Sequence, residues 1–107
     1  MSKYLSKVTI NVNHFGDEIS FTLKQLLMKD LLLVRELSSQ GEAKMLIAYV
    51  DLLPVYLESF SGLKDANGND LPVEALKDAY FLNAVAELAT KHVQAAVPEN
   101  PTPPGGQ

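Results

Sequence analysis

The chain contains no cysteine and no tryptophan, and its densest apolar segment is short. Without thiols, neither a disulfide framework nor a cysteine-based metal site can form, which fits a reducing compartment. The apolar segment runs from Met45 to Leu57, is interrupted by Asp51 and Pro54, and falls below the about 20 residues that span a bilayer. The first seven residues are polar and carry no signal-peptide pattern. We therefore expect a protein of the cytoplasm with no membrane partner.

Basic residues are also scarce, and motifs that carry chemistry are missing. The formal net charge is −4, whereas a phosphate-binding surface needs clustered Lys and Arg, so no nucleic-acid partner is expected. The sequence has neither a glycine-rich phosphate loop nor a Gly-x-Ser-x-Gly elbow. His14 and His92, its two histidines, lack metal-ligand spacing. We expect no catalytic residue, no metal and no cofactor, and hence not an enzyme.

One segment, Asp65 to Asp70, looks at first like a calcium-binding loop. An EF-hand loop needs Gly at its sixth position and a bidentate Glu at its twelfth. Counted from Asp65, these positions hold Asp70 and Leu76. Asn, Gly and Asp are common in turns for conformational reasons alone, so the segment is interpreted as a solvated turn.

What the chain does contain begins with two alternating runs. Apolar and polar residues alternate from Val8 to Val12 and from Ile19 to Leu23, which is typical of half-buried strands. His14 to Asp17 separates the runs, and Gly16 can take the positive φ of a tight turn. The pattern predicts a β-hairpin. Because a two-stranded hairpin is barely stable alone, its apolar face needs cover from the segments that follow.

Two helices are predicted next. The first runs from about Met28 to Ser39 and ends where Gly41 breaks it. A capping box formed by Thr22 and Gln25 offers an earlier start, which is disfavoured because the strand period continues through Leu23. The second spans roughly residues 42 to 60 and contains Pro54, which would kink it or divide it into two pieces; both outcomes stay open.

The remainder is predicted to hold a loop from Ser61 to Leu71, a short helix after Pro72 and a last helix from about Ala79 to Ala96, capped by Asp78. The final ten residues are rich in Pro and Gly and are interpreted as a disordered tail. The predicted fold is α+β: an N-terminal hairpin packed on a bundle of three to four helices. Residues 1–97 form one domain, and residues 98–107 form the flexible tail.

The two predicted central helices carry more apolar surface than one core contact needs. Leu46, Ile47, Val50, Leu53, Leu57 and Phe60 form a core-like stripe on the second helix. A second stripe is interpreted as partner-binding, since Tyr and Met are favoured at protein interfaces; it comprises Met45, Tyr49, Leu52 and Tyr56. The alternative, that both stripes belong to a well-packed core, stays open.

The hairpin-to-helix junction resembles the tail assembly chaperones of long-tailed bacteriophages, the small proteins of the Mu- and P2-like type. The likeness lies in an alternating strand, a turn at Gly16-Asp17, a strand ending at Leu23-Lys24 and a helix starting near Asp30-Leu31. Ser61-Gly62-Leu63 matches the end of a following helix in that family. Where the family has Pro-Thr ahead of the Asp, this chain has Leu26-Leu27, and Lys29 replaces a Gly.

The resemblance implies a function without chemistry. Such chaperones coat the long, helical tape-measure protein before the tail tube polymerises around it, and they are absent from the finished virion. It implies that this chain binds the tape-measure protein and tail-tube components in the bacterial host cytoplasm. The broad apolar surface of the predicted helices separately favours self-association. The motif residues it carries over are structural, so no active site follows from it.

A different class of function stays open from sequence. A small inhibitor or adaptor that binds a host enzyme, as anti-host-defence proteins do, is also short, acidic and without catalytic motifs. Clustered acidic residues that mimic nucleic acid would favour it, whereas here acidic and basic residues are interspersed. The neighbouring genes discriminate the two classes: tail-tube and tape-measure genes favour the chaperone, and a host-defence locus favours the inhibitor.

Overall fold

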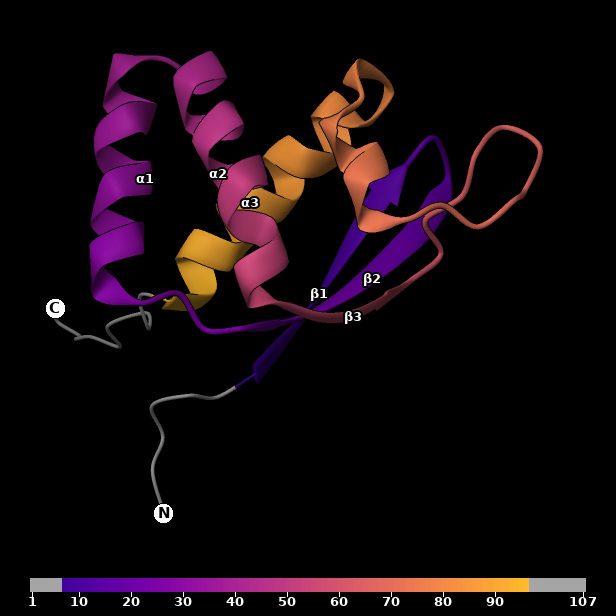
Figure 1. Cartoon of the computed structure of the whole chain (residues 1–107), viewed down its shortest axis with the longest axis horizontal. Helices are drawn as coiled ribbons and strands as arrows, with labels where there is room; N and C mark the ends of the chain where they lie inside the picture. Colours follow the sequence, from indigo (N-terminus) through magenta and orange to yellow (C-terminus); the bar gives the residue numbers. More distant parts are fainter. Residues whose placement is uncertain (1–6, 97–107) are drawn as a thin grey trace, which may run out of the picture.

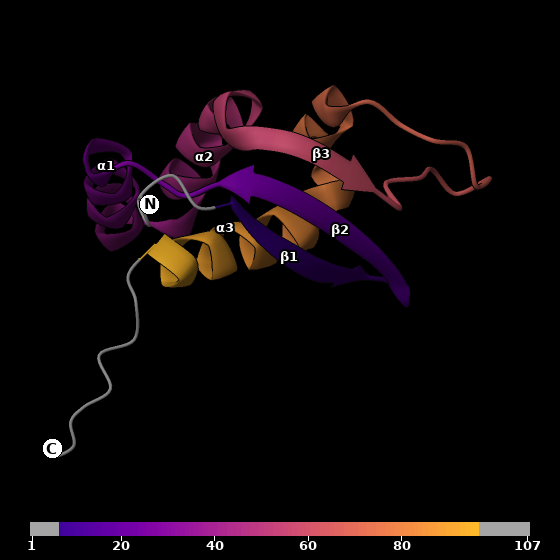
Figure 2. The ribbon, with the colours of Figure 1, turned by 90° about the horizontal axis from the view of Figure 1, so that it is seen from below.

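A computed structural model of the chain describes residues 7–96 as an α+β fold (Figure 1). A three-stranded antiparallel sheet has the order β1-β2-β3, and helices cover one of its faces (Figure 2). Figure 1 shows α1 at one side of the molecule, packed against α2. The elements are β1 (Lys7–His14), β2 (Asp17–Lys24), α1 (Met28–Gln40), α2 (Glu42–Tyr56), β3 (Leu57–Ser61), the 3-10 helices η1 (Val73–Lys77) and η2 (Ala79–Phe81), and α3 (Leu82–Ala96).

The predicted hairpin is confirmed. β1 and β2 pair with Ile10 opposite Phe21 and Val12 opposite Ile19, which places their apolar side chains together on the covered face. The connection has two residues, Phe15 and Gly16, with φ of 52° and 88°. Positive φ at both residues is the geometry of a type I′ turn, whose twist matches that of the flanking strands.

The second predicted helix is wrong at its C-terminal end. It was expected to reach Phe60, but α2 ends at Tyr56 and the next five residues form β3, which pairs with β2. Pro54 lies in the last turn of α2, where it removes a backbone donor. α2 runs through Pro54 as one helix and is not divided into two. Phe60 instead lies opposite Phe21, with ring centroids 6.5 Å apart, and so extends the sheet.

The first predicted helix is confirmed as α1, with its start at Met28. The earlier start is wrong because Thr22 lies within β2, opposite Thr9 and Ser59. Gly41 ends the helix with φ of 143°, and its N–H donates to the carbonyl oxygen of Leu37 at 3.1 Å. α2 begins at the next residue, so the two helices form an antiparallel pair.

The C-terminal helices also follow the prediction. A short helix after Pro72 is present as the 3-10 helix η1, and the Asp78 carboxylate accepts a hydrogen bond from the Tyr80 N–H at 2.9 Å at the start of η2. η2 runs directly into α3. In the loop before η1, the Asp65 carboxylate accepts the N–H groups of Asn67 and Asn69 at 2.8 and 2.9 Å, which is the geometry of a turn. The predicted disordered tail lies outside the described residues.

The resemblance placed the end of a helix at Ser61-Gly62-Leu63, whereas here these residues end a strand. Gly62 has φ of +85°, and a Cβ at this position would lie 2.5 Å from the carbonyl oxygen of Glu18. The close approach lets the chain leave β3 beside β2. Among residues 7–96, no helix is long and apolar enough to cross a membrane.

Gly62→Ala is expected to destabilise the fold more than Gly68→Ala. Both glycines have φ of +85°, but the Cβ at residue 68 would meet nothing within 4 Å. The shared cost of a left-handed Ala is about 1–2 kcal/mol, and the backbone clash at residue 62 adds about 1–3 kcal/mol. Chemical denaturation measures both variants. Equal losses in the free energy of unfolding would show that the close approach of Gly62 to β2 adds nothing to the cost of the substitution.

Candidate functional site

The predicted partner-binding stripe is wrong as a surface, because it lies mostly inside the molecule. Tyr49 is 1% exposed, and Met45 and Tyr56 are likewise buried. Leu52 is partly buried against the same core. α2 lies between α1 and the sheet–α3 layer (Figure 1), so the side chains facing these neighbours become core. Met45, Tyr49 and Tyr56 are therefore not available to another chain in this fold.

The two buried tyrosines make polar contacts within the core. The hydroxyl of Tyr49 lies 2.7 Å from Nδ1 of His92, and Nε2 of His92 lies 2.8 Å from the carbonyl oxygen of Lys24. Since a carbonyl only accepts, Nε2 carries the proton, and Nδ1 accepts from Tyr49. His92 has no exposed surface. Burial lowers the pKa of His92 and raises that of Tyr49, so both side chains stay neutral.

Tyr56 joins α2 to the start of α1. Its hydroxyl donates to the Asp30 carboxylate and accepts the Leu27 N–H at 3.1 Å. Burial, and then the hydrogen bond to Asp30, raise the pKa of Tyr56. The Leu27 N–H is one of the backbone donors that the start of a helix leaves without an intrahelical partner. Both tyrosine networks hold the fold together and give no sign of a reactive site.

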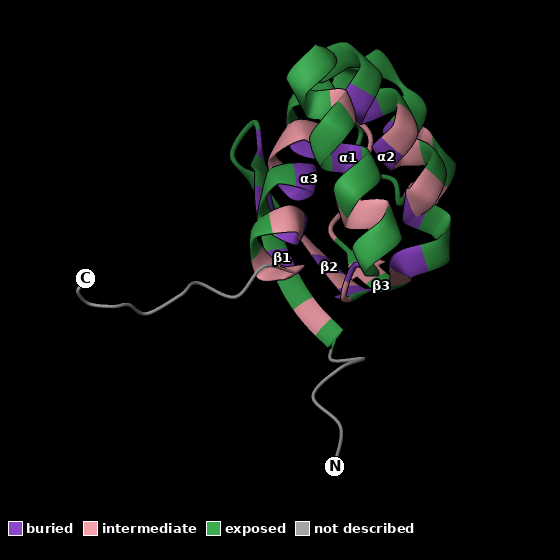
Figure 3. Cartoon of the chain, turned by 90° about the vertical axis from the view of Figure 1, so that its left-hand side faces the viewer, coloured by how far each residue is buried: buried purple, intermediate pink, exposed green. Residues whose placement is uncertain are grey.

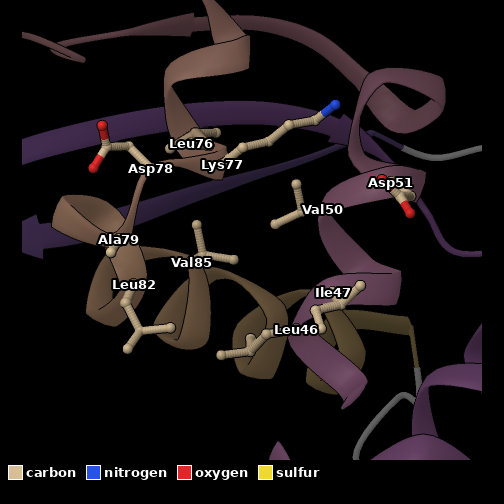
Figure 4. Close-up of a pocket in the computed structure, with 10 residues that line it drawn as sticks. All are labelled: Leu46, Ile47, Val50, Asp51, Leu76, Lys77, Asp78, Ala79, Leu82 and Val85. Atoms are coloured by element: carbon tan, nitrogen blue, oxygen red, sulfur yellow. The ribbon is translucent and has the colours of Figure 1, made fainter. Parts of the chain in front are cut away.

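An apolar groove lies between α2, the η1–η2 segment and the start of α3 (Figure 4). Its volume is about 270 Å³. Ile47 and Leu82 stand at opposite walls and are 68% and 53% exposed. We call this feature the α2–α3 groove; its apolar lining is Leu46, Ile47, Val50, Leu76, Ala79, Leu82 and Val85.

Three charged residues border the α2–α3 groove. Figure 4 shows Asp51 at one end and Asp78 at the other, with the Lys77 ammonium extended away from Asp78. The rim thus carries two carboxylates and one ammonium. A partner segment with an apolar face and basic flanks complements this arrangement.

A second apolar surface lies on the outward side of α1. Figure 3 shows α1 largely exposed on this side, and its one fully buried residue is Val34. Met28 and Leu32 are one helical turn apart, and both are exposed together with Leu33. We call Met28, Leu32 and Leu33 the α1 strip.

The α2–α3 groove and the α1 strip are mainly apolar. The groove is lined almost wholly by aliphatic side chains, which bury apolar partner surface without directional chemistry. Across residues 7–96, no group of three or more His, Asp or Glu side chains is placed to hold a metal ion. His14 and His92 lie in separate parts of the core.

The exposed face of α2 was not predicted from the sequence. Ile47 was assigned to the core stripe, but the buried residues of α2 occupy one arc of the helix, and Ile47 lies outside it. That arc, formed by Met45, Leu46, Tyr49, Leu53 and Tyr56, follows helical spacing and was visible in the sequence. Which of the competing arcs faced the core depended on the positions of α1 and α3.

Comparison with protein-family models, with curated proteins and with solved structures found no match to this chain.

Acid is expected to weaken the fold through His92. Because burial lowers its folded-state pKa below the ordinary value of 6.5, the unfolded chain binds this proton first. The contribution of neutral His92 to the free energy of unfolding is complete above about pH 6.5. As the pH decreases, this contribution falls by up to about 1.4 kcal/mol per pH unit until the folded-state pKa is reached. Urea titrations of wild type and His92→Gln from neutral to mildly acidic pH measure the difference. If the two proteins show the same pH slope, His92 does not titrate in this way.

Proposed function

We propose that this chain is a bacteriophage tail assembly chaperone that binds the tape-measure protein, keeps it soluble and helps tail-tube assembly without remaining in the virion. The proposal combines the hairpin-to-helix resemblance with surfaces suited to holding apolar helices. It requires no catalysis, no cofactor and no nucleic acid. It places the protein in the cytoplasm of the bacterial host.

The observation that carries the proposal is the α2–α3 groove. An amphipathic helix binds such a groove by inserting apolar side chains spaced at three or four residues. Ile47 and Leu82 form the opposing walls, and Val50 and Val85 lie between them (Figure 4). Because aliphatic walls impose little directional chemistry, the groove can take successive segments of a long helix.

The rim charges favour a particular kind of segment. Asp51 and Asp78 complement basic residues that flank an apolar face, and the formal net charge of −4 adds long-range attraction to a basic partner. The same charge keeps a protein with exposed apolar groups soluble. We propose that a tape-measure segment bound here has apolar anchors bordered by Lys or Arg.

The α1 strip supports the proposed self-association. Met28 and Leu32 project from the outward side of α1, away from its contact with α2. Chaperone subunits joined through α1 would place several grooves along one long helix of the partner.

The groove assignment is tested by Ile47→Asp combined with Leu82→Asp. Both side chains are exposed, so the fold should persist while two carboxylates oppose apolar insertion. We expect binding to the tape-measure fragment encoded by the same genome to weaken at least about tenfold. On co-expression, the soluble fraction of the fragment should fall to the level seen without the chaperone.

Val55→Asp is the matched control, because Val55 is 65% exposed on the same helix and does not line the groove. It should rescue the fragment as wild type does. Equal rescue by the control and the groove variant would exclude the groove as the binding site. Failure of the wild-type protein to bind or solubilise the fragment would refute the proposed function itself.

Self-association is tested by Met28→Glu combined with Leu32→Glu. If the α1 strip joins subunits, light scattering should give a smaller mass for the variant than for wild type, because charges replace apolar contacts between subunits. Circular dichroism should show unchanged helix content, since both side chains are exposed. A wild-type protein that is monomeric at high concentration would contradict this part of the proposal.

A further inference from the structure

Four rings from two distant segments meet at the tip of the β1–β2 hairpin. We call them the hairpin-tip cluster: His14 from the end of β1, Phe15 from the turn, and Tyr80 and Phe81 from η2. The ring centroid of His14 lies 4.5 Å from that of Phe15 and 4.9 Å from those of Tyr80 and Phe81. The Phe15 and Tyr80 centroids are 5.6 Å apart with an interplanar angle of 40°.

Neither turn geometry nor burial explains the residue at position 15. Phe15 has φ of 52°, a conformation that favours Asn, Asp or Gly over a bulky side chain. Its ring is 76% exposed, and Tyr80 beside it is 48% exposed. A strained, exposed aromatic residue at a turn therefore forms one wall of a surface whose other wall is Tyr80.

The base of the cluster contains a polar atom without a protein partner. His14 is 7% exposed, and among residues 7–96 its Nε2 is the buried side-chain nitrogen or oxygen that accepts or donates no hydrogen bond. Such a group costs free energy unless it finds a partner. Nε2 of an imidazole donates or accepts according to the tautomer, so a polar group of a ligand at this position supplies the missing partner.

The charge around the cluster is negative. Asp17 lies opposite His14 in the hairpin register, and Asp78 caps η2 one residue before Ala79. The Lys64 ammonium lies 2.7 Å from the Asp70 carboxylate and the Lys91 ammonium lies 2.9 Å from the Glu87 carboxylate, while Lys77 extends over the α2–α3 groove (Figure 4). Exposed aromatic faces flanked by carboxylates suit a cation.

We propose that the hairpin-tip cluster binds a cationic side chain of a partner protein, with arginine preferred over lysine. A planar guanidinium stacks on the faces of Phe15 and Tyr80, and its N–H groups donate to the carboxylate of Asp17. They also donate to Nε2 of His14 in the tautomer in which that nitrogen accepts. Lysine supplies the charge but not the planar stacking. Asp78 borders both surfaces, but the four rings belong to the cluster and not to the groove lining, so variants at Phe15 and Tyr80 test this proposal separately from the chaperone function.

The probe is N-acetyl-arginine amide, titrated into the ¹⁵N-labelled full chain and followed by amide chemical shifts. We expect saturable shifts at Phe15, Gly16 and Ala79 to Phe81. N-acetyl-citrulline amide has nearly the same shape without the charge and should bind at least about threefold more weakly. Equal binding of the two probes, or shifts spread evenly over the surface, would overturn the proposal.

Phe15→Asn tests the aromatic wall without harming the turn, since Asn accepts positive φ. We expect it to retain the hairpin amide spectrum and to bind the arginine probe at least about threefold more weakly. Tyr80→Ala should weaken binding to a similar extent, and Val55→Asn, an exposed apolar residue elsewhere, should bind as wild type does. Wild-type binding by both cluster variants would exclude the cluster as the site.

Discussion

Tyr49, His92 and the backbone carbonyl of Lys24 join the three main parts of this protein. The tyrosine belongs to α2, the histidine to α3 and the carbonyl to the end of β2. Because the Tyr49 and His92 side chains are buried, each needs its partner to avoid an unpaired polar group in the core. Where α2 and α3 lie on the sheet follows from this constraint, and so does the opening between them.

The functional surfaces are consequences of that packing. α2 turns one arc toward its neighbours, which leaves Ile47 and Val50 on the side that faces η1 and the start of α3. Aliphatic side chains and a mixed-charge rim are compatible with holding a helix and offer nothing for covalent chemistry. The hairpin tip differs in kind, since aromatic rings, a buried imidazole and carboxylates select for charge rather than for apolar area.

Local patterns predicted much of the fold. Strict alternation predicted β1 and β2, Gly41 predicted the end of α1, and Asp78 predicted the capped start of the last helix, because each signal acts over a few residues. β3 was missed for a physical reason. Residues 57 to 60 continue a helical apolar spacing, and only pairing with β2, a contact distant in sequence, makes the strand the better state.

In the candidate site, too, some features follow from the sequence and others depend on contacts between segments distant in sequence. Sequence by itself determined that the central helices are rich in apolar residues, that no thiol chemistry is available and that the net charge is negative. It did not determine which side of α2 lies in the core. Tyr49 and Tyr56 are of a residue type that is common at protein interfaces, yet both are buried. Tertiary structure alone decided this, because the burial of a helix face depends on the elements that pack against it. The pairing of Phe15 with Tyr80 arises in the same way, from segments that meet only in the folded chain.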